Sequence, residues 1–231
     1  LRCPFCQNDE ISWSERAFRY AELGKRDEAA NRKVCAEELE MLTPEELARA
    51  AKFYQKHGNI GVAFTYNEPL IGYEFVRDTA KLVKEQGMVN VLVTNGTAEL
   101  SVLEELSPYI DAMNIDLKGF TDRYYNEVLG GNREMVMKFI ERAVQICHVE
   151  ITTLVIPGEN DSEEEMRQIS EFIAGLKNAE GQMIGEEVPL HISRFFPCFH
   201  MTDRNATDVG LIYRLADVAR EKLEYVYTGN C

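Results

Sequence analysis

Six short apolar runs alternate with helical stretches along most of this 231-residue chain. The runs occupy residues 60–64, 89–93, 112–115, 149–155, 188–192 and 223–227. Strands separated by helices of about ten or more residues return to the same end of a sheet, so they pair in parallel. Their near-continuous apolar character indicates that both faces of the sheet are covered. The alternation therefore predicts an α/β fold around a parallel sheet, with six strands visible.

Polar segments marked by glycine, proline or charged residues follow five of these strands. They occupy residues 65–69, 94–96, 116–119, 157–161 and 193–194. In a parallel sheet such segments gather at the carboxyl edge of the strands, where barrel enzymes carry their catalytic residues. A doubly wound open sheet would place its ligand at a single switch point instead. We therefore predict a partial (β/α) TIM-type barrel, as a single domain over residues 1–231 with a charged helical insertion at about 17–38.

Local signals mark where several helices begin. Thr43 with Glu46 forms a predicted capping box, and a proline occupies the first helical position. Ser162 with Glu165 predicts a second cap of the same kind. We expect the last helix to begin at Thr207. These signals place helices on either side of the predicted strands.

The bulk composition limits the partners of the chain. Its formal net charge is −14 at pH 7 and its sequence pI is about 4.8. A nucleic-acid surface normally needs a basic footprint, and an anionic membrane repels an acidic chain, so neither is expected as a partner. No apolar run approaches the roughly 18 residues of a membrane span, and no signal peptide is visible. With scattered cysteines and no disulfide framework, the sequence predicts a cytoplasmic protein in a reducing compartment.

The first eight residues contain the one pair of cysteines with the spacing of metal or redox ligands, Cys3 and Cys6. By itself this pair fits half of a zinc site, a redox pair or part of an iron–sulfur ligand set. A structural zinc site needs four ligands, and the sequence has no second Cys-x-x-Cys or close pair of histidines. A thioredoxin-like pair fits Pro4 but not the predicted topology. Because the motif occupies the first residues, we expect further residues of the site to precede Leu1, the chain being truncated at its N-terminus.

Four more motifs follow in order at the ends of successive strands. They are Tyr66-Asn67-Glu68-Pro69, Val93-Thr94-Asn95-Gly96, Asp116-Leu117-Lys118 and Val155-Ile156-Pro157-Gly158. With the first eight residues they make the chain resemble the radical S-adenosylmethionine (SAM) enzymes. In that resemblance Cys3 and Cys6 match the last two cysteines of a Cys-x3-Cys-x2-Cys motif, whose first cysteine is expected two residues before Leu1. The chain resembles the pyruvate formate-lyase activating enzymes and, more closely, the AmmeMemoRadiSam system enzymes, which Ser193-Arg194-Phe195 fits.

The resemblance implies two cofactors, a [4Fe–4S] cluster held by Cys3 and Cys6, and SAM bound to its open iron. An electron from a flavodoxin- or ferredoxin-type donor would cleave SAM to methionine and a 5′-deoxyadenosyl radical, which abstracts hydrogen from a substrate. The activating enzymes imply a protein substrate, a glycyl-radical enzyme. In enzymes of this type the backbone of the residue at Phe5 contacts the adenine.

The same resemblance assigns roles to the first two strand-end motifs. Asn67 and Glu68 stand where the family accepts hydrogen bonds from the ammonium group of the ligand. They equally fit a helix cap followed by proline at the first helical position. Thr94 and Asn95 offer two side-chain hydrogen-bonding groups, but Val93 replaces the aspartate of the activating enzymes. That replacement removes any cation or ribose contact made by the aspartate.

Asp116, Lys118 and Arg194 complete the candidate site. Asp116 suits ribose hydroxyl groups and Lys118 the carboxylate of the ligand, although the two also fit a mutual surface ion pair worth roughly 0–1 kcal/mol. Arg194 either binds a carboxylate through both of its terminal nitrogens or covers the mouth of the barrel. The sequence does not assign a residue to the hydrogen abstraction itself.

Two other classes of function remain open on the residues alone. One is a zinc- or thiol-based binding protein that uses Cys3 and Cys6 without radical chemistry. The other is a cluster-free barrel enzyme that uses Glu68, Asp116 and Lys118 for acid–base catalysis. Metal analysis and replacement of the cysteines distinguish them from a radical SAM enzyme.

Overall fold

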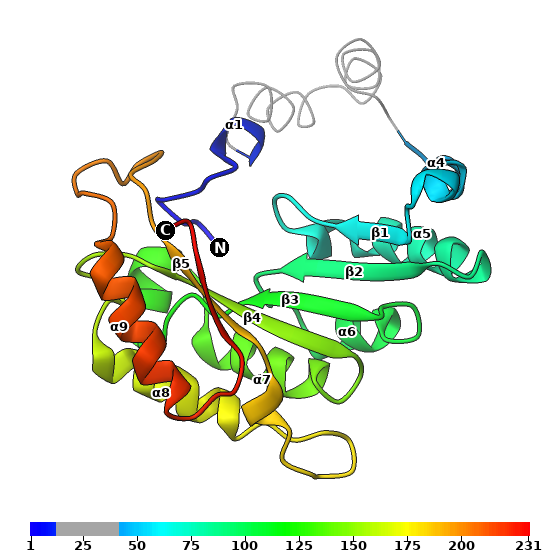
Figure 1. The fold of residues 1–231 in the computed structure, drawn as a ribbon. Coiled ribbons are helices and arrows are strands. Elements are labelled where there is room, and N and C mark those ends of the chain that lie inside the picture. Colours follow the sequence, from blue (N-terminus) through cyan, green and yellow to red (C-terminus); the bar gives the residue numbers. More distant parts are fainter. Residues whose placement is uncertain (13–41) are drawn as a thin grey trace.

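A computed structural model describes residues 1–12 and 42–231, so the insertion predicted at about 17–38 lies outside the described residues. Its centre is one sheet of six parallel strands in the order β1-β2-β3-β4-β5-β6 (Figure 1). The strands are β1 (Gly61–Phe64), β2 (Val89–Thr94), β3 (Ala112–Asp116), β4 (His148–Val155), β5 (Leu190–Arg194) and β6 (Val226–Gly229). The predicted α/β fold with six parallel strands is confirmed.

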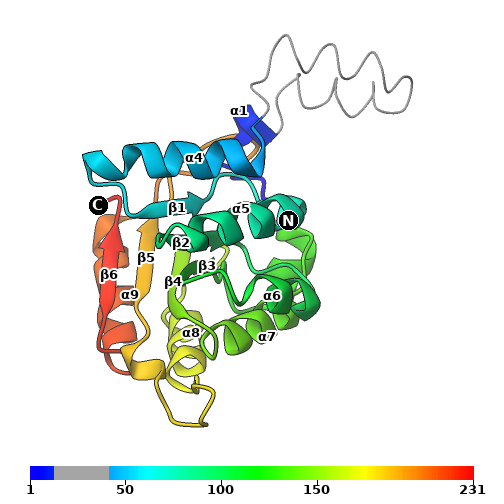
Figure 2. The same cartoon turned by 90° about the vertical axis from the view of Figure 1, so that its right-hand side faces the viewer.

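Every crossover between neighbouring strands contains a helix, as parallel pairing requires. In chain order these are α5 (Tyr73–Glu85), α6 (Leu100–Leu106), α7 (Arg133–Ala143), α8 (Glu163–Ala174) and α9 (Val209–Arg220). Helix α4 (Pro44–Tyr54) precedes β1, and the short α1 (Asp9–Ser12) follows the cysteine motif. A π-helix, η3 (Tyr124–Leu129), lies between β3 and α7. Figure 2 shows these helices around the outside of the strands.

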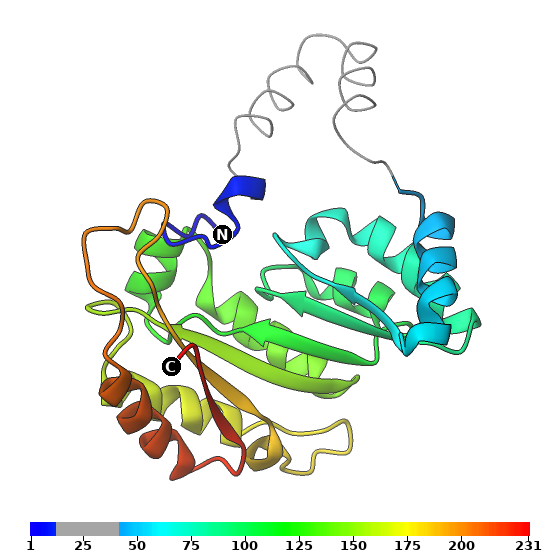
Figure 3. The same cartoon turned by 45° about the horizontal axis from the view of Figure 1, so that its top comes forward.

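The sheet is curved, and its two edge strands are β1 and β6 (Figure 3). Each strand pairs with the next one along the chain, from Gly61 opposite Val89 to Ser193 opposite Gly229. Because no pairing joins β6 to β1, the described part of the chain forms a partial rather than a closed barrel. This arrangement brings all six carboxyl strand ends to one rim, as the barrel prediction requires.

One face of the sheet is covered by helices and the other is only half-buried. Along β4 the side chains alternate, with Val149 and Ile151 buried and Glu150 and Thr152 on the opposite face partly exposed. The expectation that both faces are covered is therefore wrong. The sheet curls so that its inner face lines an open space, whereas only the outer face packs against the helices.

The predicted helix starts are only partly confirmed. Thr43 and Glu46 form the complete capping box before α4. Ser162 caps α8 by accepting from the backbone of Glu165, but the Glu165 carboxylate accepts from the Phe120 backbone N–H, 2.6 Å away, instead of closing a capping box. The last helix begins after Asp208 rather than at Thr207. Tertiary contacts override both signals.

The structure also bears on membrane insertion. Across residues 1–12 and 42–231, no helix combines the length and the apolar character needed to cross a bilayer.

Candidate functional site

A pocket of about 440 Å³ lies at the carboxyl rim of the sheet. Its lining residues come from the cysteine motif and from the carboxyl ends of strands β1 to β5. Among its lining residues are nine of the ten candidates from the sequence: Cys3, Phe5, Cys6, Asn67, Glu68, Thr94, Asn95, Asp116 and Lys118. Residues separated by more than one hundred positions in the chain therefore share one cavity.

The cysteine motif forms a turn that faces this pocket. The Phe5 side chain is 3% exposed and packs in the core, so a ligand in the pocket would meet its backbone rather than its ring. Burial raises the pKa of the Cys3 thiol, and the nearby Lys118 ammonium opposes that shift. Cys3 and Cys6 are both partly buried and neither forms a disulfide. The turn thus presents two free thiols to the cavity.

The chain leaves β1 through two consecutive residues with left-handed backbone conformations. Tyr66 has φ 62° and Asn67 has φ 59°. Asparagine adopts this region readily, but for a bulky residue it is strained, and such strain concentrates at functional sites. Both residues line the pocket, and Tyr66 is 69% exposed. The strain is therefore located at the pocket rim.

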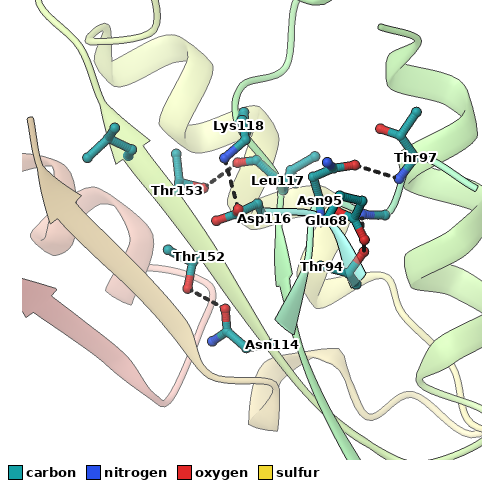
Figure 4. Close-up of polar contacts among 12 residues, drawn as sticks. Glu68, Thr94, Asn95, Thr97, Asn114, Asp116, Leu117, Lys118, Thr152 and Thr153 are labelled. Carbon is teal, nitrogen blue, oxygen red and sulfur yellow. Dashed lines mark hydrogen bonds and ion pairs between the residues drawn. The ribbon is translucent and has the colours of Figure 1, made fainter. Parts of the chain in front are cut away.

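Glu68, after the end of β1, forms hydrogen bonds with residues at the end of β2. Its Oε1 accepts from the Thr94 hydroxyl at 2.7 Å (Figure 4). The same oxygen accepts from the Leu70 backbone N–H at 3.1 Å. Its Oε2 accepts from the backbone N–H of Asn95 at 2.8 Å. The helix-cap interpretation is confirmed, since the contact to Leu70 caps the short 3-10 helix Pro69–Gly72. The carboxylate is thus held by three donors while it lines the pocket.

Asp116 and Lys118 form an ion pair with 2.8 Å between Oδ2 and Nζ (Figure 4). The Lys118 side chain is only 15% exposed, so this is not a surface pair. Burial alone would lower the pKa of Lys118, but the negative charge of Asp116 and the hydrogen bond to it raise the pKa above its ordinary value. Lys118 is therefore a permanent cation beside the thiols.

Residues that the sequence did not single out form hydrogen bonds with the backbone of Leu117 and Lys118 and so fix the segment that carries this cation. Thr153 donates to the Leu117 carbonyl at 2.8 Å, and the Tyr125 hydroxyl accepts from the backbone N–H of Lys118 at 3.1 Å. The fully buried Asn160 donates to the Lys118 carbonyl at 2.7 Å and to the Leu154 carbonyl at 2.9 Å. In the sequence it is only one member of the polar segment 157–161. Its role becomes visible only in the structure, where the ends of β3 and β4 lie side by side and the Asn160 amide is buried between them.

Arg194 is the one candidate that does not line the pocket. Its Nε donates to the Thr207 carbonyl at 2.6 Å, and its guanidinium lies 4.7 Å from the centre of the Phe196 ring. The structure therefore places Arg194 at the base of the loop that follows β5.

Comparison with known families identifies the chain. The model of the radical SAM superfamily matches residues 1–169, which include both cysteines and the ends of β1 to β4. The chain belongs to the radical SAM superfamily. Members of this superfamily use a [4Fe–4S] cluster and SAM, so these are the cofactors that the pocket has to accommodate.

Two curated relatives illustrate what this chain is similar to. An uncharacterized protein of Methanocaldococcus jannaschii, MJ0808, is 34% identical over 232 residues, covering all of this chain. The chain spans about 60% of the length of that relative. The pyruvate formate-lyase-activating enzyme of Clostridium pasteurianum is 28% identical over 181 residues, covering 78% of this chain and 68% of the relative.

Solved structures show the same fold. A domain of a pyruvate-formate lyase-activating enzyme from Bacteroides vulgatus has a TM-score of 0.61 at 20% identity, covering 74% of this chain and 99% of that one. SuiB of Streptococcus suis, solved bound to SAM, has a TM-score of 0.64 at 14% identity, covering 83% of this chain and 44% of SuiB. At these identities the likeness concerns the fold alone.

The residues of the pocket fit the two cofactors of the superfamily in their chemistry. Thiolates are the ligands of iron–sulfur clusters, and the two thiols of the turn are free and face the cavity. Within residues 1–12 and 42–231, no group of three His, Cys, Asp or Glu side chains is arranged to hold a metal ion. The described residues therefore place two free thiols, Cys3 and Cys6, beside a cation and two carboxylates, a set of groups whose chemistry fits a cluster and a zwitterionic ligand.

Proposed function

We propose that this protein is a radical SAM enzyme that cleaves SAM reductively and uses the product for hydrogen abstraction. The observation that carries the proposal is the pocket itself, in which Cys3 and Cys6 share one cavity with Glu68, Asp116 and Lys118. When bound, the cluster and SAM supply the one-electron chemistry and the 5′-deoxyadenosyl radical. The chain contributes thiolate ligands, orientation of SAM and a partly enclosed space.

Each rim residue has a defined task in this proposal. The Lys118 ammonium binds the carboxylate of SAM, and Asp116 accepts from ribose hydroxyl groups while it keeps Lys118 charged. Glu68 orients Thr94 and Asn95 toward the pocket through the hydrogen bonds that it accepts from them. The side-chain amide of Asn67 and the backbone of Phe5 supply further polar contacts. Arg194 lies outside the pocket and stabilises the base of the loop after β5 through its hydrogen bond to the Thr207 carbonyl.

The cluster needs a third thiolate, which we propose comes from a cysteine two positions before Leu1. This position follows from the Cys-x3-Cys-x2-Cys spacing to which Cys3 and Cys6 conform. The proposed reaction also needs an electron donor of the flavodoxin or ferredoxin type, which supplies the electron for the cleavage of SAM.

The proposed substrate is a protein, a glycyl-radical enzyme. The similarity to pyruvate formate-lyase-activating enzymes and to a 4-hydroxyphenylacetate decarboxylase activating enzyme from Clostridium scatologenes supports this choice. Within this branch we propose that the chain belongs with the AmmeMemoRadiSam system, because Ser193-Arg194-Phe195 fits that group. Incubation with a candidate partner should produce a protein radical that deuterated glycine identifies by its altered resonance spectrum.

The decisive experiment is anaerobic reconstitution of the full-length protein with iron and sulfide, followed by reduction with SAM. We expect cluster absorbance and formation of 5′-deoxyadenosine and methionine. Cys3→Ala or Cys6→Ala should reduce both to background, whereas Cys147→Ala, outside the pocket, should not. Absence of both signals in the wild-type protein contradicts the proposal. Stoichiometric zinc without labile sulfide would favour a zinc-binding protein, and activity in the Cys3→Ala variant a cluster-free enzyme.

A further inference from the structure

We infer that the loop between β5 and α9 positions the cysteine turn, and that the side chain of Cys198 contributes to this by a hydrogen bond. The inference rests on the proposed function, because the position of the turn matters when its thiols hold a cluster. The Cys198 thiol donates to the Phe5 carbonyl at 3.3 Å. The backbone N–H of His200 donates to the Pro4 carbonyl at 2.8 Å. Both carbonyls between the two cysteines are thus held by one distant loop.

The holding loop is itself a well-defined turn. The backbone N–H of Met201 donates to the Cys198 carbonyl at 2.9 Å, and the two residues form an isolated bridge. Phe199, inside this turn, has φ 50°, a left-handed conformation that is strained for an aromatic residue. Met201 is 5% exposed and packs in the same core as Phe5. The strain is maintained because core packing and the bridge fix the turn.

The cysteine turn has a second support on its other side. The backbone N–H of Arg2 donates to the Leu129 carbonyl at 2.7 Å, at the end of the π-helix η3. The thiols are therefore held between a segment that follows β3 and a segment that follows β5. Of the three hydrogen bonds, two are formed by backbone groups alone. Only the bond from Cys198 can be removed by changing a donor side chain.

Outer contacts of this kind control how firmly metal ligands are held. Groups that orient metal ligands without binding the metal commonly change its affinity or activity by about 10- to 100-fold when they are mutated, and hydrogen bonding around clusters sets their potentials. Cys198 acts through the backbone carbonyl at Phe5, so it is a positioning residue. Its thiol donates a hydrogen bond, and a hydroxyl group can do the same.

The test compares Cys198→Ala with Cys198→Ser in the full-length protein after anaerobic reconstitution. The readouts are the rate of iron loss to a chelator, the reduction potential and the resonance spectrum of the reduced cluster with SAM. We expect Cys198→Ala to lose iron about 10-fold faster, with a shifted potential, and Cys198→Ser to recover most of the wild-type behaviour. Cys147→Ala, a half-buried cysteine away from the pocket, is the matched control. Wild-type iron retention and potential in Cys198→Ala would overturn the inference.

A second measurement separates this inference from the proposed function. In the cluster-free protein, Cys198→Ala should raise the rate at which iodoacetamide alkylates Cys3 and Cys6 by about 2-fold, because a thiol is a weak donor and its hydrogen bond lies at the low end of the usual strength. Cys198→Ser should stay near the wild-type rate, and thermal unfolding shows whether each variant is folded. If the wild-type protein takes up no cluster, the proposed function fails, and equal alkylation rates in all variants would still reject the positioning role.

Discussion

The two halves of the pocket are built in different ways. At the strand ends, Glu68, Asp116 and Lys118 are fixed by contacts with their own or neighbouring loops, and all of these elements belong to adjacent strands of one sheet. The turn with Cys3 and Cys6 is instead held by segments near residues 129 and 198–200. The rim is therefore preorganised by the sheet, whereas the cysteine turn is held by a few long-range hydrogen bonds and by the core packing of Phe5. Changes in the rim should affect folding and ligand binding together, and changes at the turn should affect mainly the cluster.

The strongest test of this difference removes the buried amide of Asn160. Asn160→Ala leaves Ile156 N–H and the carbonyls of Lys118 and Leu154 without their partner in a buried site. At about 1–3 kcal/mol for each unsatisfied group, with partial relaxation, we expect about 3 kcal/mol lower unfolding free energy. For a chain of this size that corresponds to a melting temperature lower by roughly 6–12 °C, measured by calorimetry or circular dichroism.

Asp161→Ala is the matched control for that variant, because its carboxylate accepts from Gly158 N–H in the same loop through a hydrogen bond that is exposed to solvent. It should cost about 1 kcal/mol or less. If both variants melt alike, the strand ends are not held by the buried amide, and the contrast with the cysteine turn is lost.

A smaller effect is expected from Asp116→Asn, which removes the negative charge that stabilises the Lys118 cation. In the wild-type protein the pKa of Lys118 is raised above that of an ordinary lysine. The contribution of the ion pair to the stability of the fold is therefore complete below the ordinary lysine pKa, and it disappears only as the pH rises through the raised pKa of Lys118. In the variant, burial lowers the pKa of Lys118. We expect SAM to bind about 10-fold more weakly at pH 7.5, which is about 1.4 kcal/mol, and more weakly still toward pH 10.

Calorimetric titration with SAM at several pH values measures this effect. The control is Asp122→Asn, which removes the exposed partner of Arg133, outside the pocket. A pH-independent affinity in Asp116→Asn, equal to that of the wild-type protein, would show that the rim does not depend on this charge pair.

The smallest effect is expected from Thr43→Ala, which removes the cap of α4 far from the pocket. Loss of a capping side chain costs about 1 kcal/mol, so the melting temperature should fall by a few degrees. Cluster content and SAM affinity should not change. A parallel loss of either would mean that general destabilisation, rather than local contacts, controls the pocket.

Much of the fold and the place of the pocket could be predicted because they depend on local patterns, whereas the roles of individual residues such as Phe5 and Asn67 were implied by the resemblance to radical SAM enzymes. The alternation of apolar runs with helices predicted the six parallel strands, and the polar strand ends predicted where the pocket lies. The prediction was wrong where distant groups compete for a side chain. Glu165 bonds to Phe120 rather than closing its own cap, and Thr207 donates to the Val155 carbonyl rather than starting a helix.

The sequence by itself therefore determined the parallel α/β topology, the two thiols and the polar groups at the strand ends, because strand–helix periodicity and ligand spacing are properties of neighbouring residues. Only the tertiary structure decided that Lys118 is a largely shielded cation, that Arg194 lies outside the pocket, and that Cys198 contacts the turn between Cys3 and Cys6. These facts depend on burial and on hydrogen bonds between segments far apart in the chain. Such contacts exist only after the sheet has curved and brought its strand ends to one rim.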